Sequence, residues 1–205
     1  MLSALNANQI EQYRNAVVNA FPEIVRKSPV IAAYWERVER YFPEYQLFLV
    51  SDDGDIVAFI NSIAFSWEGE LDELPREGWD WMLIKGISDY EQGIQVNSLG
   101  GLQIIVRQDY LGQGNSKVII DKAKEEVKER GFENFVITIR PTYKHRHPQM
   151  KMSEYMHYRV NDKIYDPWIR THLKGGAEIL NICDRAMHVY GSINFWEGIM
   201  KQPIT

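Results

Sequence analysis

The sequence predicts a single mixed α/β domain. Runs rich in β-branched and aromatic residues surround the turn sequence "DDGD", which is typical of a β-hairpin. Several other segments repeat apolar residues at helical spacing, so helices and strands alternate along the chain. Apolar side chains make up 45 % of the 205 residues, which is enough for one substantial core. Because we find no internal repeat and no low-complexity linker, we treat residues 1–205 as one domain.

The first half of the chain contains helices around a hairpin. Residues 1–45 predict two N-terminal helices, the first with Asn8 and Glu11 at the spacing of a capping box, the second begun by Ser28 and Pro29. The hairpin lies within residues 45–67. A third helix follows, with apolar residues at helical spacing from Trp79 to Tyr90.

The middle of the chain predicts a strand, a helix and another strand. The sequence "NSLGGLQIIV" has the composition of a buried strand, with a bulge expected at Gly100 and Gly101. Residues 118–127 repeat apolar positions at helical spacing, and "NFVITIRP" predicts the next strand.

The last third is less regular. Within residues 141–165 we expect a short hairpin at Asn161 and Asp162. The sequence "DPWIRTHLKGG" predicts a short helix capped by Asp166. Two strands, "AEILNIC" and "MHVYGSINFW", are expected to close the chain, with Cys183 in the first. Edge pairing through these strands would make a homodimer.

Charge and cysteine content exclude some classes of protein. The net charge of −5 argues against a general nucleic-acid binder. A single cysteine excludes an internal disulfide and fits a reducing compartment. The N-terminus lacks a basic segment followed by an apolar one, and no segment is long and apolar enough for a membrane span. We therefore expect a cytoplasmic protein without a membrane partner.

The sequence "YLGQGNSK" is the strongest functional signal. The helix begins at or just after Gly114, and the first carboxylate after this point is Asp121. The unpaired N–H groups of a helix start favour an anion, and Gly112 and Gly114 leave room for a phosphate near the backbone. An ordinary turn that needs positive φ is the alternative. Neither the dinucleotide fingerprint nor the Walker loop fits the glycine spacing.

This segment resembles the acyl-CoA-binding motif of the GNAT superfamily of N-acetyltransferases. Val106 to Tyr110 is similar to the family's "V-x-P-x-Y", with Gln108 in place of proline, and residues 111–116 occupy the six loop positions. Leu111 replaces the usual Arg or Gln. The resemblance implies a mixed, mostly antiparallel sheet flanked by helices, with residues 98–137 as the motif. The residues implied to bind acetyl-CoA or another acyl-CoA are Ile105, Val106, Leu111, Gly112, Gln113, Gly114, Asn115, Ser116 and Lys117.

Other stretches resemble a bacterial subgroup of this superfamily. They are "NSIAFSW", "EGWDW", "RPTYK" and "DPWIRTHLKGGAEI", and the subgroup carries similar "RPxxK" and "DPWxRxH" sequences. We know of no agreed substrate for the subgroup, so this resemblance is more specific about the fold than about the acceptor.

Acyl transfer needs a group that protonates the leaving thiolate. Alignment of "THLKGGA" with the family's acid-bearing helix puts His172 in the acid position, where a helix C-terminus would favour an imidazolium. Tyr155 and Tyr158 are rivals. A packing role for His172 against Trp168 stays open.

We expect the acceptor to enter between residues 61–67 and residues 141–172. Asn61 and Trp67 would then contact it, and Arg140 and Lys144 could bind an acidic acceptor or the nucleotide 3′-phosphate. Asn61, Ser62 and Gln103 could hold a water that acts as base.

Residues 141–165 form an insertion on the acceptor side. They contain His145, His147 and His157, but no cysteine pair or carboxylate–histidine helix accompanies these residues. We therefore expect no metal site.

The sequence thus predicts an N-acyltransferase that moves an acetyl or other short acyl group from acyl-CoA to an amine by direct attack, because no Cys or Ser has a nucleophile arrangement. The acceptor would be a small molecule or a protein. A non-catalytic acyl-CoA-binding sensor or partner module is the alternative.

Overall fold

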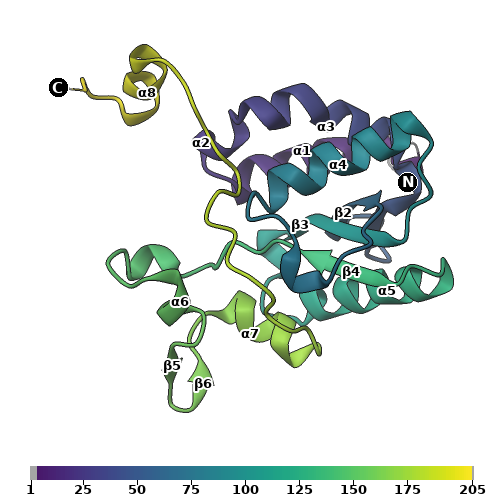
Figure 1. Cartoon of the computed structure of the whole chain (residues 1–205). Helices are drawn as coiled ribbons and strands as arrows, with labels where there is room; N and C mark the ends of the chain where they lie inside the picture. Colours follow the sequence, from purple (N-terminus) through teal and green to yellow (C-terminus); the bar gives the residue numbers. More distant parts are fainter. Residues whose placement is uncertain (1–3, 205) are drawn as a thin grey trace.

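The structure, a computed structural model, describes residues 4–204 and contains one four-stranded sheet between helical layers (Figure 1). The sheet has the order β1-β2-β3-β4, in which β3 and β4 are parallel and the other pairs antiparallel. This confirms the predicted mixed, mostly antiparallel sheet flanked by helices. Its strands are β1 (Gln46–Val50), β2 (Ile56–Phe65), β3 (Ser98–Val106) and β4 (Asn134–Ile137).

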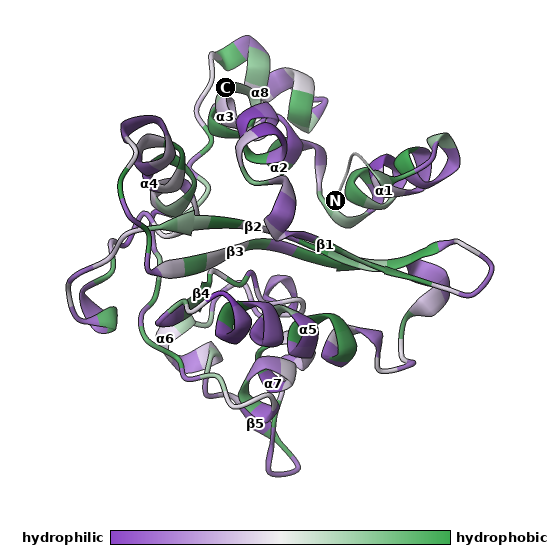
Figure 2. Ribbon diagram, turned by 90° about the vertical axis from the view of Figure 1, so that its right-hand side faces the viewer, coloured by the Kyte–Doolittle hydropathy of each residue, from purple (hydrophilic) through white to green (hydrophobic). Residues whose placement is uncertain are grey.

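The helices cover the two faces of this sheet (Figure 2). One face carries α1 (Ala7–Ala20), the short α2 (Glu23–Arg26), α3 (Pro29–Tyr41) and α4 (Trp79–Gln92). The other face carries α5 (Asn115–Glu129), with α7 (Pro167–Lys174) beyond it. The remaining elements are α6 (Met152–Tyr155), the small hairpin of β5 (Arg159–Val160) and β6 (Lys163–Ile164), and α8 (Ile193–Met200). The hairpin at Asn161 and Asp162 is therefore confirmed.

Successive side chains of β2 pack into the cores on opposite faces of the sheet. Phe59 packs with Tyr13 of α1, whereas Ile60 packs with Ile119 of α5, as the period of two in a strand requires. Helix α4 lies especially close to β2 because Gly86 has no side chain. A Cβ on Gly86 would come 2.5 Å from Cγ1 of Ile63, which is closer than carbon atoms can approach.

A β-bulge interrupts the pairing of β2 with β3. Asn61 pairs with Gln103 and Ser62 with Gly101, so Leu102 is the extra residue. The bulge was expected at Gly100 and Gly101, immediately before its actual position. The indole Nε1 of Trp79 donates to the Leu102 carbonyl oxygen at 2.7 Å and so fixes the bulge.

Strands β3 and β4 separate at this bulge. Their parallel pairing ends at Gly101 and Ile137, and residues 138–142 continue outside the sheet. The diverging backbones leave an opening between the two faces, which the functional site uses.

The start of the chain differs in detail from the sequence prediction. The capping box of α1 consists of Asn6 and Gln9, not Asn8 and Glu11, because the helix starts earlier than its apolar pattern. Helix α3 begins at Pro29 as predicted, but the Ser28 hydroxyl makes no capping hydrogen bond.

The prediction of two terminal strands was wrong. Residues 177–192 contain no strand, and the segment after Ser192 forms α8, where the Ser192 hydroxyl accepts from the Phe195 N–H. Two apolar side chains of this region, Ala186 and Met187, pack against the core around Trp79 instead of a strand partner, whereas Ile179, Leu180 and Tyr190 are exposed. Cys183 lies beside Gly78 and not in a strand. The edge through which we expected a homodimer is therefore absent from residues 4–204.

Candidate functional site

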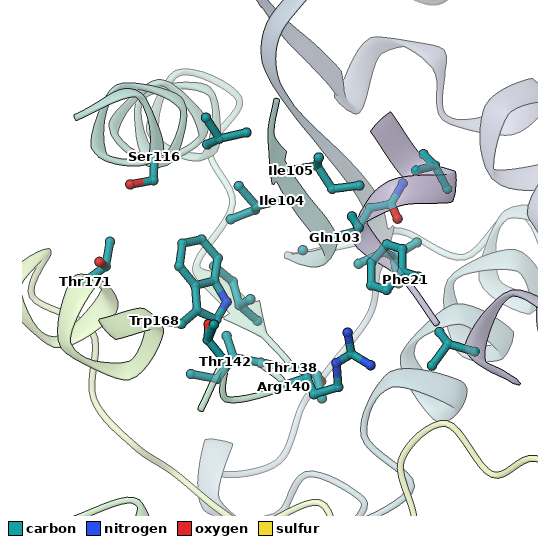
Figure 3. Close-up of a pocket in the computed structure, with 18 of the residues that line it drawn as sticks. Phe21, Gln103, Ile104, Ile105, Ser116, Thr138, Arg140, Thr142, Trp168 and Thr171 are labelled. Carbon is teal, nitrogen blue, oxygen red and sulfur yellow. The ribbon is translucent and has the colours of Figure 1, made fainter. Parts of the chain in front are cut away.

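A cavity of about 720 Å³ passes through the opening between β3 and β4. Its walls come from both faces of the sheet: helices α1 to α4 on one side, and the glycine loop with α7 on the other (Figure 3). Residues of β3 and the segment after β4 form the narrow part between them. One end of this cavity therefore lies at the glycine loop, and the other end lies under the N-terminal helices α1 to α4. We call this second end the acceptor chamber.

The glycine loop begins α5 as predicted. Gly112 has φ +75° and Gly114 has φ +83°, and a Cβ at either position would meet nothing within 4 Å. The first turn of α5 has no acidic residue. Within residues 4–204, the backbone N–H groups of residues 112–116 donate to no protein acceptor. The loop thus offers free N–H groups at the positive end of a helix dipole.

Not every predicted loop residue faces the cavity. The lining includes Ile105, Val106, Leu111, Gly112, Gly114, Asn115 and Ser116. Gln113 and Lys117 are outside it: Gln113 donates to the Asp109 carbonyl oxygen, and Lys117 pairs with Asp121 on the surface of α5.

A chain of hydrogen bonds between side-chain amides reaches the cavity from the α1 side, and we call it the amide relay. Gln103 lines the cavity and donates from Nε2 to Oδ1 of Asn61 at 2.6 Å. Asn61, which is fully buried, donates in turn to Oε1 of Gln46 at 2.8 Å. Gln46 donates to two backbone carbonyl oxygens, those of Phe42 and Ser62. The relay fixes the side chain of Gln103, and the Gln103 amide oxygen is left free of these bonds.

A second polar group lies on the same face. Trp35 lines the cavity and donates from Nε1 to Oε1 of Glu39 at 3.1 Å, and the Tyr13 hydroxyl donates to the same oxygen at 3.2 Å. Burial and the neighbouring Glu39 carboxylate raise the pKa of Tyr13, so its phenol stays protonated. The sequence analysis did not identify these residues, because only the tertiary fold brings α1 next to α3.

Two arginines line the same side. Arg140 extends toward Phe21 (Figure 3), with its Cζ 5.6 Å from the centroid of that ring. Arg26 also lines the cavity and donates from Nε to the Phe21 carbonyl oxygen at 3.2 Å. Arg140 was among the predicted acceptor contacts, whereas Arg26 was not.

His172 does not have the charge expected for it. The ring is 6 % exposed, packs edge-on against Trp168 with centroids 4.5 Å apart, and lies near Lys124. Burial, together with the Lys124 ammonium, lowers the pKa of His172 to about 4. The imidazole is therefore neutral at pH 7, and its buried Nε2 has no hydrogen-bond partner within residues 4–204. Trp168 and Thr171 line the cavity from α7, but His172 lies behind them.

The predicted tyrosines are also outside the lining. The Tyr155 hydroxyl donates to Oδ2 of Asp166 at 2.9 Å, and the side chain is fully buried. Burial and the Asp166 carboxylate raise the pKa of Tyr155. Tyr158 packs against His147 and Tyr165. Within the described chain, the titratable side chains that line the cavity are Arg26, Tyr110 and Arg140.

The other predicted contacts lie elsewhere. Lys144 donates to the His147 carbonyl oxygen, and Trp67 donates from Nε1 to the Glu70 carbonyl oxygen. Asn61 acts on the cavity only through Gln103. Across residues 4–204, no three His, Cys, Asp or Glu side chains gather as they would around a metal ion. None of the helices in this range could cross a membrane.

Known proteins support this interpretation of the fold. The chain is 28 % identical over 193 residues to the arginine N-acetyltransferase avaD of Aspergillus versicolor. The alignment covers 86 % of this chain and 66 % of that protein, so the chain spans just under two thirds of the relative's length. The crystal structure of the loading GNATL domain of CurA from Lyngbya majuscula superposes with a TM-score of 0.57 at 19 % identity, covering 70 % of each chain. No protein-family model matches the chain.

Proposed function

We propose that the chain is a member of the GNAT superfamily and that it transfers an acetyl or other short acyl group from acyl-CoA to a small-molecule amine. The observation that carries this proposal is the cavity, which joins the glycine loop on one face of the sheet to an acceptor chamber on the other. A transferase needs both compartments, whereas a simple strand-to-helix turn needs neither.

The loop residues fit coenzyme A by their chemistry. The open space beside Gly112 and Gly114 admits a pyrophosphate to the backbone, and the free amides of residues 112–116 would bind it. The strand β3 and the lining side chains Ile104, Val106 and Trp168 would hold the pantetheine arm along the apolar opening. When bound, acyl-CoA supplies a thioester that an amine can attack.

The side chains around the opening favour catalysis by positioning. A neutral amine forms the new N–C bond while the C–S bond breaks, and the proton of the amine must leave. The fixed Gln103 amide is suited to orient the amine or a water that accepts this proton. Because His172 and Tyr155 are buried behind the lining, we propose that the thiolate takes its proton from water.

Because the curated relative carries the name arginine N-acetyltransferase, L-arginine belongs in the first panel of amines. The chain spans only 66 % of that relative, and its own acceptor is to be found by screening.

Thermal unfolding with acetyl-CoA tests the donor site first. A ligand at about 100 times its dissociation constant adds roughly 2.7 kcal/mol of stability, which raises Tm by several degrees. We expect Gly112→Asp to remove this shift, because it introduces a carboxylate where the pyrophosphate binds. Gly131→Asp is the matched control: Gly131 has φ +74° with nothing within 4 Å of its Cβ, and it lies at the opposite end of α5.

Release of the CoA thiol with an amine panel then separates the two functions. Turnover supports the transferase. A thermal shift without thiol release for any amine would favour a non-catalytic acyl-CoA sensor, and no shift with acetyl-CoA or a longer acyl-CoA would rule out both.

A further inference from the structure

Two guanidinium groups line the acceptor chamber without a carboxylate partner. By contrast, Arg107, which follows β3, is paired with Asp55 and Asp109. Within residues 4–204, neither Arg26 nor Arg140 forms a salt bridge.

The local charges explain why these arginines stay unpaired. Glu23 is the acidic residue closest in sequence to Arg26, but its Oε1 is paired with Lys27 at 2.7 Å. Desolvation at the cavity wall lowers the pKa of Arg140, with no neighbouring carboxylate to oppose that effect. Both side chains are exposed to solvent, and the described cavity lining contains these two cations but no carboxylate, so its charge favours an anionic ligand.

Both arginine side chains contact Phe21. The Arg140 guanidinium lies over the Phe21 ring, and Arg26 is held by the carbonyl oxygen of the same residue. They come from opposite parts of the chain, since Arg26 ends α2 and Arg140 follows β4. Their common position is therefore a property of the fold and of this cavity.

The phosphates of coenzyme A are an unsuitable partner for this pair. The glycine loop lies on the α5 face of the sheet, and α1 and α2 lie on the other face (Figure 2). Phosphates bound at the loop would therefore lie at the other end of the cavity from Arg26. An anion that contacts both arginines is better supplied by the molecule in the acceptor chamber.

We propose that Arg26 and Arg140 bind the carboxylate of the acceptor, so that the substrate is an amino acid or a closely related carboxylated amine. The inference rests on the proposed acyl transfer and specifies its substrate class. Guanidinium groups bind carboxylates through paired N–H···O bonds, which would orient the amine toward Gln103 in the same cavity. A decarboxylated or amidated analogue would leave both cations unpaired.

The test compares the proteinogenic L-amino acids with their carboxamides. Each pair is assayed for thiol release with acetyl-CoA and, independently of turnover, for stabilisation in thermal unfolding with and without CoA. The variants are Arg26→Gln, Arg140→Gln and the charge-conserving Arg140→Lys. Arg14→Gln is the control, because Arg14 is an exposed arginine of α1 that does not line the cavity.

We expect the wild-type protein to prefer at least one amino acid over its carboxamide. Arg140→Gln and Arg26→Gln should each lower kcat/KM for that amino acid about 10- to 100-fold, the effect of losing a charge-assisted hydrogen bond. The carboxamide should change little, Arg140→Lys should retain part of the preference, and Arg14→Gln all of it. The acetyl-CoA thermal shift should persist in every variant.

Equal stabilisation and turnover of acids and amides would overturn the carboxylate site, and so would an unchanged preference in both glutamine variants. If the proposed acyl transfer itself is wrong, acetyl-CoA should not raise the Tm of the wild-type protein, and this outcome is distinct from the two above.

Discussion

The hydroxyl of Tyr155 donates a hydrogen bond of 2.9 Å to Oδ2 of Asp166, and both side chains are fully buried. The same Oδ2 accepts the Tyr143 N–H at 2.8 Å. Oδ1 accepts the N–H groups of Trp168 and Ile169, which begin α7. One carboxylate thereby joins the loop after β4, α6 and α7, and so positions the Trp168 side of the cavity.

Asp166→Ala should therefore destabilise the protein by about 2–4 kcal/mol, since it removes a helix cap and leaves a buried phenol and a backbone N–H unpaired. Tyr155→Phe loses a single hydrogen bond and should cost about 1–2 kcal/mol. Urea unfolding measures both changes. If Tyr155 is structural, Tyr155→Phe keeps kcat near the wild-type value. A large loss of kcat with unchanged stability would instead identify Tyr155 as the general acid.

His172 predicts a specific pH dependence of stability. The unfolded state binds a proton on this imidazole near pH 6.5, whereas the folded state does so only near pH 4. Between these values the unfolded state holds more protons, so the free energy of unfolding must fall as pH falls. The contribution of His172 is fully present above about pH 7, and on the order of 2–3 kcal/mol should be lost by pH 4.

The variant His172→Gln isolates this effect from the carboxylates that titrate in the same range. Urea unfolding at several pH values should show a steeper loss of stability on acidification in the wild-type protein than in the variant. Parallel curves would mean that His172 is accessible to protons in the folded state, and would restore it as an acid candidate.

The sequence predicted the features that depend on neighbouring residues. The "DDGD" hairpin, the start of α5 at Gly114 and the Asp166 cap each depend on turn or capping chemistry within a few positions. The resemblance in the loop also identified the fold correctly. These features were sufficient to locate one end of the cavity.

The rest depends on contacts between distant parts of the chain. Alternating apolar residues from Met187 to Phe195 predicted a strand, but Met187 packs against the core around Trp79, whereas Ile193 is exposed and begins α8. The position of His172 near a helix C-terminus predicted a charged imidazole, but burial and the nearby Lys124 ammonium lower its pKa. Arg26 ends a four-residue helix that has no periodic signal, so its place in the cavity could not be predicted from sequence.

Gln103, which donates a hydrogen bond to Asn61, should contribute to turnover but not to the binding of acetyl-CoA. Gln103→Leu should leave the acetyl-CoA thermal shift intact, because the glycine loop is on the other face, and should lower kcat about tenfold or more by releasing the oriented amine or water. Thiol release at saturating acetyl-CoA measures the effect. Asn61→Leu should act similarly on kcat but also destabilise the fold, since it leaves Gln46 without its buried donor. An unchanged kcat in Gln103→Leu would show that the amide relay has no role in catalysis.

Glu39 lies one hydrogen bond behind Trp35, which lines the cavity. Glu39→Gln retains an oxygen that can accept from both Tyr13 and Trp35 but cannot take up the acceptor's proton. If Glu39 only positions Trp35, the variant should keep kcat/KM within about threefold, a change of less than 1 kcal/mol in the barrier. Glu39→Leu should lose activity and stability together, because it leaves the indole and phenol donors unpaired. A loss above about 100-fold in Glu39→Gln, with the acidic limb of the pH profile removed, would show that the proton of the amine reaches this carboxylate.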